Sequence, residues 1–446
     1  MKLVQIPLAL ALAASALLAA PAPQATARES VSAATPDFDG DGKADVAVTT
    51  EDDSESEFLR IWYGSGRLAD ILPADLSAGQ YGIHNLALLA RDLNGDGYTD
   101  LVAATSDSSG VYVHIVPGSA AGLQPANRHS FLAFGKADER VKALALVEAP
   151  TPRLAVSLSN EEVRLYPLSS AGIPTGNPIA LVPGKAKVPS MVKGSFGSSM
   201  DAWGNQLFVG APDAKVNGKS AAGAVLAVTL DSAGVKSLKT ITQATTSVTG
   251  AVDKYDHFGN AVVARDGYLV VGTPSDNVGT VKRTGSIQVF TLSGKGTIKP
   301  VKRIAQSSAG IPGKAERYDY FGAHLALGTT CNGIPTVLVG GPGEAIAKGH
   351  ESDDGSAWLI PLRTVKDCVA SQIYEGHGLP GTPWFRYIGD LLAFVRDGGA
   401  ANDDLVIGGG GSFSEGPAGR LYRISAATGV ATKLGSDGFI DTVAGR

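Results

Sequence analysis

Short apolar runs recur along the chain, and each begins directly after a residue that ends a turn. Seven residues that precede such runs lie 53 to 68 positions apart, as expected for one supersecondary unit repeated seven times. These seven anchors are Asp45, Asp100, Arg153, Gln206, Tyr268, Thr336 and Asp404.

Each anchored run predicts a strand, and a second apolar run follows it after a polar loop. The second runs are residues 58–63, 111–116, 163–168, 224–230, 286–292, 356–362 and 420–424. Alternation such as Val111-Tyr112-Val113-His114-Ile115 predicts strands that pack mainly on one face. Ahead of six anchors, an aromatic residue or Ile is followed by Gly and an apolar stretch: Tyr81-Gly82, Phe134-Gly135, Phe196-Gly197, Phe258-Gly259, Phe321-Gly322 and Ile388-Gly389.

With a less regular last strand, each unit has four antiparallel strands, which we call A to D. Such a sheet cannot bury both faces alone, whereas radial stacking of seven sheets buries them and leaves only short edges. We therefore predict an all-β fold, a single seven-bladed β-propeller of four-stranded antiparallel blades over residues 28–446. Unit 1 lacks the aromatic-Gly element, so its first strand is expected between Arg28 and Pro36. Residues 439–444 resemble the missing element, which favours the alternative that the tail folds back against blade 1.

Two loops ahead of the first two anchors carry oxygen-bearing side chains at positions one, three, five and nine. Ca²⁺ takes about six to eight oxygen ligands, and carboxylates at alternate loop positions can supply them. An EF-hand is excluded because position twelve is Val48 or Ala103 and a strand-like run follows. The alternative is a plain Asp/Gly turn. The expected calcium ligands are Asp37, Asp39, Asp41 and Asp45, then Asp92, Asn94, Asp96 and Asp100, with the backbone carbonyls of Lys43 and Tyr98 at position seven.

Residues 1–27 have the pattern of a cleaved secretory signal, with Lys2, an apolar run and a small-residue cleavage site. No later segment has about 18 continuous apolar residues, so we expect a secreted protein without a membrane span. The net charge is −5, and loss of Lys2 with the leader makes it one unit more negative. A nucleic acid partner, which needs a basic face, is therefore not expected.

Units with Phe-Gly ahead of strand A and Gly-Ala-Pro-like residues after strand B resemble the FG-GAP repeats of the integrin α-subunit N-terminal propeller. They are also similar to secreted bacterial proteins with FG-GAP and VCBS-type repeats. The Gly-Ala-Pro-like residues are Gly210-Ala211-Pro212, Gly272-Thr273-Pro274 and Gly340-Gly341-Pro342. The resemblance implies calcium loops between strands A and B on a lower rim, and a partner-binding upper face made of the B to C and D to A loops. Units 4, 5 and 6 lack the calcium pattern, and unit 7 offers Asp397, Asn402, Asp403 and Asp404 at altered spacing.

The two cysteines test the strand order. Cys331 falls in the A to B loop of unit 6 and Cys368 in its C to D connection. Alternate loops of an antiparallel meander share an edge, so we expect a disulfide between them on the lower rim, which a secreted protein permits. The alternative is two unrelated thiols.

The expected function is binding or adhesion to an extracellular protein or glycan, by a monomer that calcium stabilises structurally. The B to C loops differ most between units and carry many acidic residues, as in residues 51–57, which predicts an acidic, variable upper face. Nucleophile-elbow, zinc-helix and phosphate-loop motifs are missing from the sequence, so an enzyme is the less favoured class. The alternative function is an extracellular hydrolase or lyase with a central-channel pocket, because carboxylates paired in space leave no sequence pattern.

Overall fold

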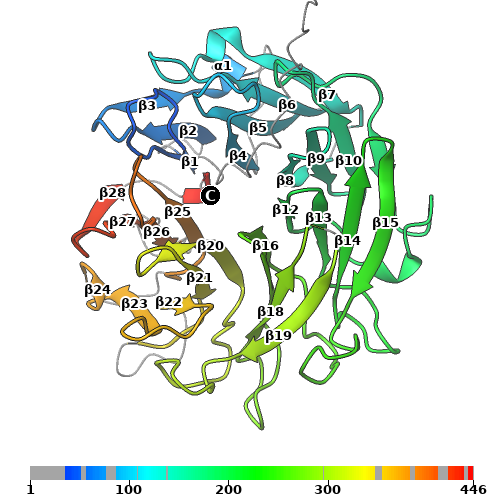
Figure 1. Cartoon of the computed structure of the whole chain (residues 1–446), viewed down its shortest axis with the longest axis vertical. Helices are drawn as coiled ribbons and strands as arrows, with labels where there is room; N and C mark the ends of the chain where they lie inside the picture. Colours follow the sequence, from blue (N-terminus) through cyan, green and yellow to red (C-terminus); the bar gives the residue numbers. More distant parts are fainter. Residues whose placement is uncertain are drawn as a thin grey trace, which may run out of the picture. The chain divides into compact units, whose positions relative to one another are not determined.

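The computed structural model describes residues 36–51, 57–76, 87–107, 109–136, 139–294, 296–346, 354–381, 387–409, 420–435 and 440–444. The expected leader, residues 1–27, and the Tyr81-Gly82 element lie outside these residues. From Ala33 onward the chain forms one compact unit. Within it, seven sheets are arranged around a central axis, as Figure 1 shows. The predicted seven-bladed β-propeller is confirmed.

The blades follow the chain, and each begins with its innermost strand and continues outward. Blade 1 contains β29 (Ile440–Ala444), β1 (Val46–Glu51), β2 (Glu57–Trp62) and β3 (Leu68–Ile71). Blade 2 contains β4 (Leu88–Arg91), β5 (Asp100–Asp107), β6 (Gly110–Val116) and β7 (His129–Phe134). Blade 3 contains β8 (Val141–Val147), β9 (Arg153–Leu158), β10 (Val163–Pro167) and β11 (Ile179–Leu181). Blade 4 contains β12 (Met200–Trp203), β13 (Gln206–Ala211), β14 (Ala224–Asp231) and β15 (Gly234–Ile241).

Blades 5 to 7 repeat this order. Blade 5 contains β16 (Val262–Arg265), β17 (Tyr268–Thr273), β18 (Ser286–Leu292) and β19 (Ile298–Ile304). Blade 6 contains β20 (His324–Thr330), β21 (Ile334–Gly341), β22 (Ser356–Pro361) and β23 (Ser371–Glu375), with the two-residue parallel strand β24 (Gly378–Leu379) outside them. Blade 7 contains β25 (Leu391–Val395), β26 (Asp404–Gly409), β27 (Arg420–Ile424) and β28 (Ala431–Gly435). The described helical segments are α1 (Pro73–Leu76), η1 (Pro125–Asn127) and η2 (Ser190–Val192), and no described helix is long and apolar enough to cross a membrane.

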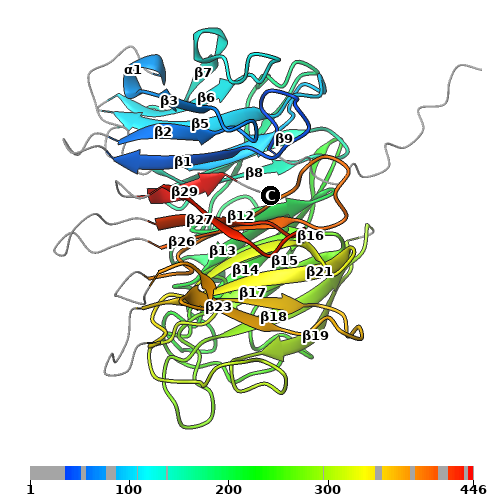
Figure 2. The same cartoon turned by 90° about the vertical axis from the view of Figure 1, so that its left-hand side faces the viewer.

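The ring closes by pairing the end of the chain with its beginning. β29 runs antiparallel to β1, with Ala444 opposite Ala47 and Ile440 opposite Thr50. Figure 2 shows the two strands next to each other. β29 therefore supplies the innermost strand of blade 1, which confirms the expected return of the tail and leaves β1 without an open edge.

Strands inside the ring are buried on both faces. Every residue of β9, β13 and β17 is buried. Between blades 5 and 6, Val270 and Val289 share one apolar cluster with Trp358. The expectation of one-sided packing, drawn from the alternation around Tyr112, was wrong: His114, at an alternate position, is only 2% exposed. A neighbouring blade covers each face, so the alternating pattern does not mark a solvent face.

The Phe-Gly and Gly-x-Pro elements interlock within and between blades. In blade 5, the N–H of Gly259 donates to the carbonyl of Gly272 at 3.0 Å. A Cβ atom on Gly272 would lie 2.1 Å from the carbonyl oxygen of Gly322 in the next blade, so only glycine permits this contact. The aromatic partners Phe258 and Phe321 are fully buried. The repeated Phe-Gly and Gly-x-Pro residues therefore form the close contacts between neighbouring blades.

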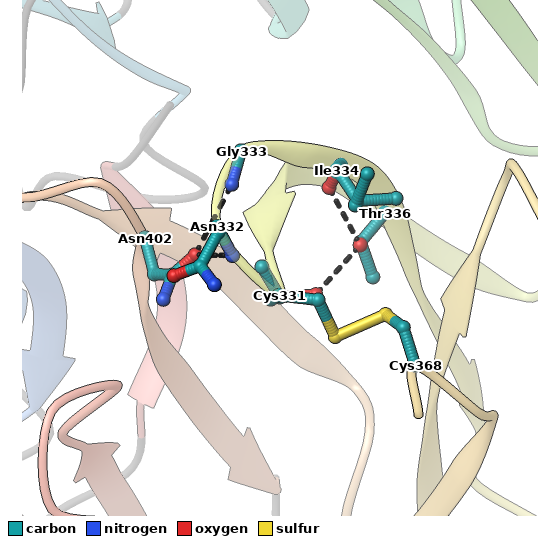
Figure 3. The surroundings of a disulfide bond; sticks show 8 residues. Cys331, Asn332, Gly333, Ile334, Thr336, Cys368 and Asn402 are labelled. Atoms are coloured by element: carbon teal, nitrogen blue, oxygen red, sulfur yellow. Dashed lines mark hydrogen bonds between the residues drawn. A yellow bond between two sulfur atoms is a disulfide. The ribbon is translucent and has the colours of Figure 1, made fainter. Parts of the chain in front are cut away.

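The two cysteines form the expected disulfide, with Cα atoms 6.0 Å apart. Cys331 lies in the turn between β20 and β21, and Cys368 lies between β22 and β23. Figure 3 shows the bond that joins them. Asn402 of blade 7 accepts hydrogen bonds from the N–H groups of Asn332 at 2.7 Å and Gly333 at 3.3 Å. This rim therefore carries the crosslink of blade 6 and a contact to blade 7, in agreement with the inferred strand order.

Candidate functional site

The first aspartate loop brings three of its carboxyl groups together. Oxygens of Asp37, Asp39 and Asp45 lie within 4.8 Å of one another. Asp41, the fourth expected ligand side chain, accepts the N–H of Lys43 at 2.8 Å. Three hard oxygen donors in one small space fit a calcium ion, so the donor set of this loop agrees with the expected metal.

The same three carboxyl groups differ in how firmly the fold uses them. Asp37 accepts the N–H groups of Asp41 at 3.1 Å and Gly42 at 3.0 Å. Asp45 accepts the N–H groups of Phe38 at 2.6 Å and Gly64 at 2.8 Å. Among the described residues, Asp39 makes a 3.4 Å contact to the backbone N–H of Asp41 and a 3.6 Å ion pair with Arg67. Asp39 is therefore the group that the loop needs least for its own shape.

The second loop has the same turn with a different arrangement of donors. Asp92 accepts the N–H groups of Gly95 at 2.6 Å and Gly97 at 3.1 Å. The side chain of Asn94 donates to Asp96 at 2.9 Å and accepts its N–H at 2.8 Å. Asp100 accepts the N–H of Leu93 at 3.0 Å. The ligand set of this loop remains a prediction, because its side chains bond one another and the backbone.

The two loops also touch each other. The N–H of Thr99 donates to the carbonyl of Asp37 at 2.9 Å, and the N–H of Asp37 donates to the hydroxyl of Thr99 at 3.0 Å. The ring of Tyr98 lies against Gly40, where a Cβ atom would come within 2.6 Å of it. The side chain of Tyr98 thus packs on the first loop, in addition to the carbonyl role expected for it.

Burial raises the pKa of the ninth residue in each loop. The pKa of Asp45 rises to about 7 and that of Asp100 to about 6, mainly because each carboxyl group is removed from water. Backbone N–H donors lower the pKa of each group, and neighbouring aspartates raise it further.

Unit 7 uses its acidic residues in other ways. Asp397 accepts the N–H of Ala44 at 2.8 Å and pairs with Arg423 at 2.8 Å. Asp403 is fully buried and pairs with Arg396. Because these carboxylates already pair with arginines, this loop is a poor candidate for an ion site. Its hydrogen bond to Ala44 instead connects blade 7 with blade 1.

We call the face formed by the B to C loops and the connections between blades the upper face. It holds a pocket of about 260 Å³ that three segments build: the connection into blade 5, the loop from β17 to β18, and the connection into blade 6. We call it the blade 5 pocket. Its lining residues are Lys254, Tyr255, Ser275, Asn277, Lys282, Arg283, Arg317 and Tyr318.

Buried aspartates hold the two connections in the same turn. Asp256 accepts the N–H of Asp253 at 2.7 Å, and Asp319 accepts the N–H of Glu316 at 2.5 Å. The tyrosines before these aspartates have positive φ angles, 67° for Tyr255 and 74° for Tyr318. L-residues rarely adopt such angles, so the fold holds both tyrosines in a strained backbone conformation at the pocket.

The loop from β17 to β18 is basic at its surface because its acid points inward. Asp276 is buried and pairs with Arg303 at 2.5 Å, whereas Lys282 and Arg283 are exposed. The expected acidic upper face therefore does not extend to this loop. Residues 52–56 and 412–417 of other B to C loops lie outside the described residues.

The central channel has its own cavity of about 470 Å³, beside the first residues of β12, β16, β20 and β25. Polar groups on its wall include Ser199, Asn260 and a pair of His324 and Asp390 at 3.5 Å. A hydrolase needs a nucleophile or general acid aligned with its partner groups. No hydrogen bond in the described part of the chain joins a wall serine to His324, so this cavity gives the enzymatic alternative little support.

Comparison with known proteins agrees with the fold. The chain is a seven-bladed β-propeller, and the model of the FG-GAP-like repeat family matches its residues 37–103, which include both aspartate loops. Two solved structures, from Bacteroides uniformis and Bacteroides fragilis, are of proteins provisionally assigned as 6-phosphogluconolactonases. They superpose with TM-scores of 0.51 and 0.50 at 10% and 9% identity, over 90% of this chain and 98% of each of theirs. At such identity the likeness concerns the fold alone. No curated protein matches the chain.

The sequence reasoning missed the blade 5 pocket. Its signal was present as a repeated pattern, Lys254-Tyr255-Asp256 and Arg317-Tyr318-Asp319, at the same distance before Phe258 and Phe321. The two copies flank one B to C loop, and this juxtaposition becomes visible only once the ring order is known.

Proposed function

We propose that the protein is a secreted binding module, a calcium-stabilised β-propeller that holds an extracellular protein or glycan through its upper face. The blade 5 pocket is the observation that carries this proposal. Three loops from a rigid scaffold build it, and ligand sites on such scaffolds are found where loops meet.

Three further features support the secreted and calcium-dependent parts. The apolar leader of residues 1–27 fits export. The disulfide between Cys331 and Cys368 suits an oxidising compartment. The carboxyl groups of the first loop would hold the ion, and the ion would neutralise charges that otherwise repel one another. The role of the ion would be structural. The first aspartate loop contacts blades 2 and 7 and contributes no lining residue to the blade 5 pocket.

Binding of the purified protein to a glycan array and to cell-wall and cell-surface protein fractions tests the proposal. We expect selective retention of at least one fraction, weaker after calcium is removed. Lack of retention on every fraction, with calcium present and the protein folded, would refute the binding role. Amino-terminal sequencing of secreted protein should begin near Arg28.

A further inference from the structure

The blade 5 pocket concentrates positive charge on an acidic protein. Lys254, Lys282, Arg283 and Arg317 line it, while the chain as a whole carries a net charge of −5. All four side chains are exposed, and none forms an ion pair with a carboxylate in the described part of the chain. Like charges held together repel one another, so an anion entering the pocket would reduce this repulsion.

The surroundings of the pocket keep these charges in place. The side-chain oxygen of Asn277 accepts the N–H of Arg283 at 3.2 Å. The guanidinium groups of Arg317 and Arg283 lie 4.4 and 5.6 Å from the ring centre of Tyr318. Arg317 also donates to the hydroxyl of Tyr318 at 2.5 Å. These contacts hold the two arginine planes in place, and the remaining N–H groups can reach an oxyanion.

Tyr255 gives the pocket a second chemical character. Tyr255 is 53% exposed, and its backbone is held at a positive φ angle on the turn that Asp256 stabilises. The C–H face of a sugar ring is apolar and can pack on an aromatic ring, while the phenol hydroxyl remains available for hydrogen bonds. Ser275 and Asn277 add polar groups of the kind that bind sugar hydroxyls.

We propose that the blade 5 pocket binds one acidic sugar unit of a polysaccharide, with its carboxylate or sulfate group against the cations and its ring on Tyr255. This inference rests on the proposed binding function and specifies its ligand class. The cavity of about 260 Å³ is just below the range of about 300 to 1,000 Å³ typical of drug-sized ligands, so it suits a single sugar unit rather than a longer segment. An acidic peptide would match the cations but would leave the exposed ring of Tyr255 without a matching apolar face.

Titration calorimetry with matched acidic and neutral glycans tests the inference. The probes are polygalacturonate oligosaccharides and their methyl esters, dextran sulfate and dextran, and a polyglutamate peptide. We expect an acidic glycan to bind and its neutral counterpart not to bind, with binding weakened by salt because charges are screened. Binding of polygalacturonate identifies a carboxylate ligand, and binding of dextran sulfate alone identifies a sulfate ester.

Paired variants separate the pocket from general charge. Lys282→Gln with Arg317→Gln should weaken binding of the acidic glycan at least tenfold. Lys236→Gln with Lys239→Gln removes the same charge from exposed positions of β15 and should leave affinity unchanged. Tyr255→Ala keeps every charge and should weaken glycan binding while sparing any binding of polyglutamate.

Several outcomes would overturn the inference. Unchanged affinity of the pocket variant shows that the site is elsewhere, and equal binding of neutral and acidic glycans removes the role of charge. Tighter binding of polyglutamate than of either acidic glycan replaces the sugar with an acidic peptide. Retention of only neutral glycans or of a protein fraction would refute this inference and leave the proposed binding function intact.

Discussion

Asp319 is a carboxyl group kept out of water by the turn that it stabilises. It is 1% exposed, and burial, together with the smaller effect of the nearby Glu344 carboxyl group, raises its pKa to about 8. Glu344, itself 4% exposed, has a pKa of about 7 for the same main reason. At neutral pH the folded protein therefore favours a protonated Asp319, whereas the unfolded chain ionises it near its ordinary value of 3.8.

Asp319→Asn should stabilise the protein at high pH. Wild-type stability due to this group is fully present below pH 4 and is lost as pH rises through about 8, because the unfolded chain releases the proton first. Asparagine keeps the oxygen that accepts the N–H of Glu316 but cannot ionise. We expect the free energy of unfolding in urea to rise by a few kcal/mol at pH 8 and to change little at pH 4.5, since one pKa unit is about 1.4 kcal/mol.

Asp231→Asn makes the same chemical change in the exposed turn between β14 and β15, where the side chain accepts the N–H of Ala233 at 2.9 Å. This control should follow the wild type across the pH range. If Asp319→Asn also follows the wild type, Asp319 does not carry a buried proton.

At the residue scale, sequence reasoning located side chains in the chain but not in space. The spacing of Asp37, Asp39 and Asp45 indicated a shared site, because neighbours in one loop must lie close together. Lys254 and Arg317 were not recognised, because their proximity depends on two connections that enter different blades.

At the scale of single elements, the crosslink in blade 6 should be a measurable source of stability. Cys331→Ser with Cys368→Ser opens a loop with a sequence separation of 37. On the chain-entropy model this costs roughly 3 to 4 kcal/mol. Urea unfolding of the wild type with and without reductant should show this difference, and reductant should leave the double variant unchanged. An equally stable variant would mean that the bond does not constrain the unfolded chain.

The first aspartate loop allows a direct test of calcium. Asp39→Ala removes one expected ligand while Asp37 and Asp45 keep their backbone hydrogen bonds. At a calcium concentration about 100 times the dissociation constant, one site contributes about 2.7 kcal/mol. Calcium should therefore raise the melting temperature of the wild type by more than that of the variant.

Chelator provides the control for this pair, since without calcium the variant, which has one repelling carboxyl group fewer, should melt no lower than the wild type. The calcium assignment fails if chelator leaves the wild-type melting curve unchanged.

Strand identity was predictable at this scale and strand burial was not. The anchors at Gln206 and Tyr268 mark the first residues of β13 and β17. Burial of His114 between Thr105 and Ser130, at 2.8 Å from each, depends on strands that a local pattern cannot reveal.

For the whole molecule, the decisive feature is the closure of the ring. Deleting residues 440–446 removes β29 and leaves Ala47 to Thr50 of β1 with an unpaired edge. Exposed edges pair with other chains, so we expect blade 1 to unfold and the truncated protein to aggregate. Size-exclusion chromatography and amide hydrogen exchange of β1 would measure both effects.

Deletion of residues 445 and 446 alone is the matched control, because β29 ends at Ala444. A monomeric protein with a protected β1 after the longer deletion would show that β29 is dispensable.

The number of blades was predictable because every unit repeats an anchor residue followed by an apolar strand, a polar loop and a second apolar strand. Ring closure was expected because residues 439–444 resemble the aromatic-Gly element that unit 1 lacks. The register in which β29 pairs with β1 could not be predicted. Registers between distant segments depend on packing across the ring, such as that of Val46 and Val48 against Val395 in blade 7.

The pairing of Ala47 with Ala444 also fixes an order of events during biosynthesis. Blade 1 must remain incomplete until β29 has been translated, so a chain interrupted upstream of β29 cannot close the ring. The first aspartate loop lies at this seam, where the N–H of Gly398 donates to the carbonyl of Gly42 at 2.6 Å. A chain that ends before β29 would therefore leave the ring open beside the loop proposed to hold calcium.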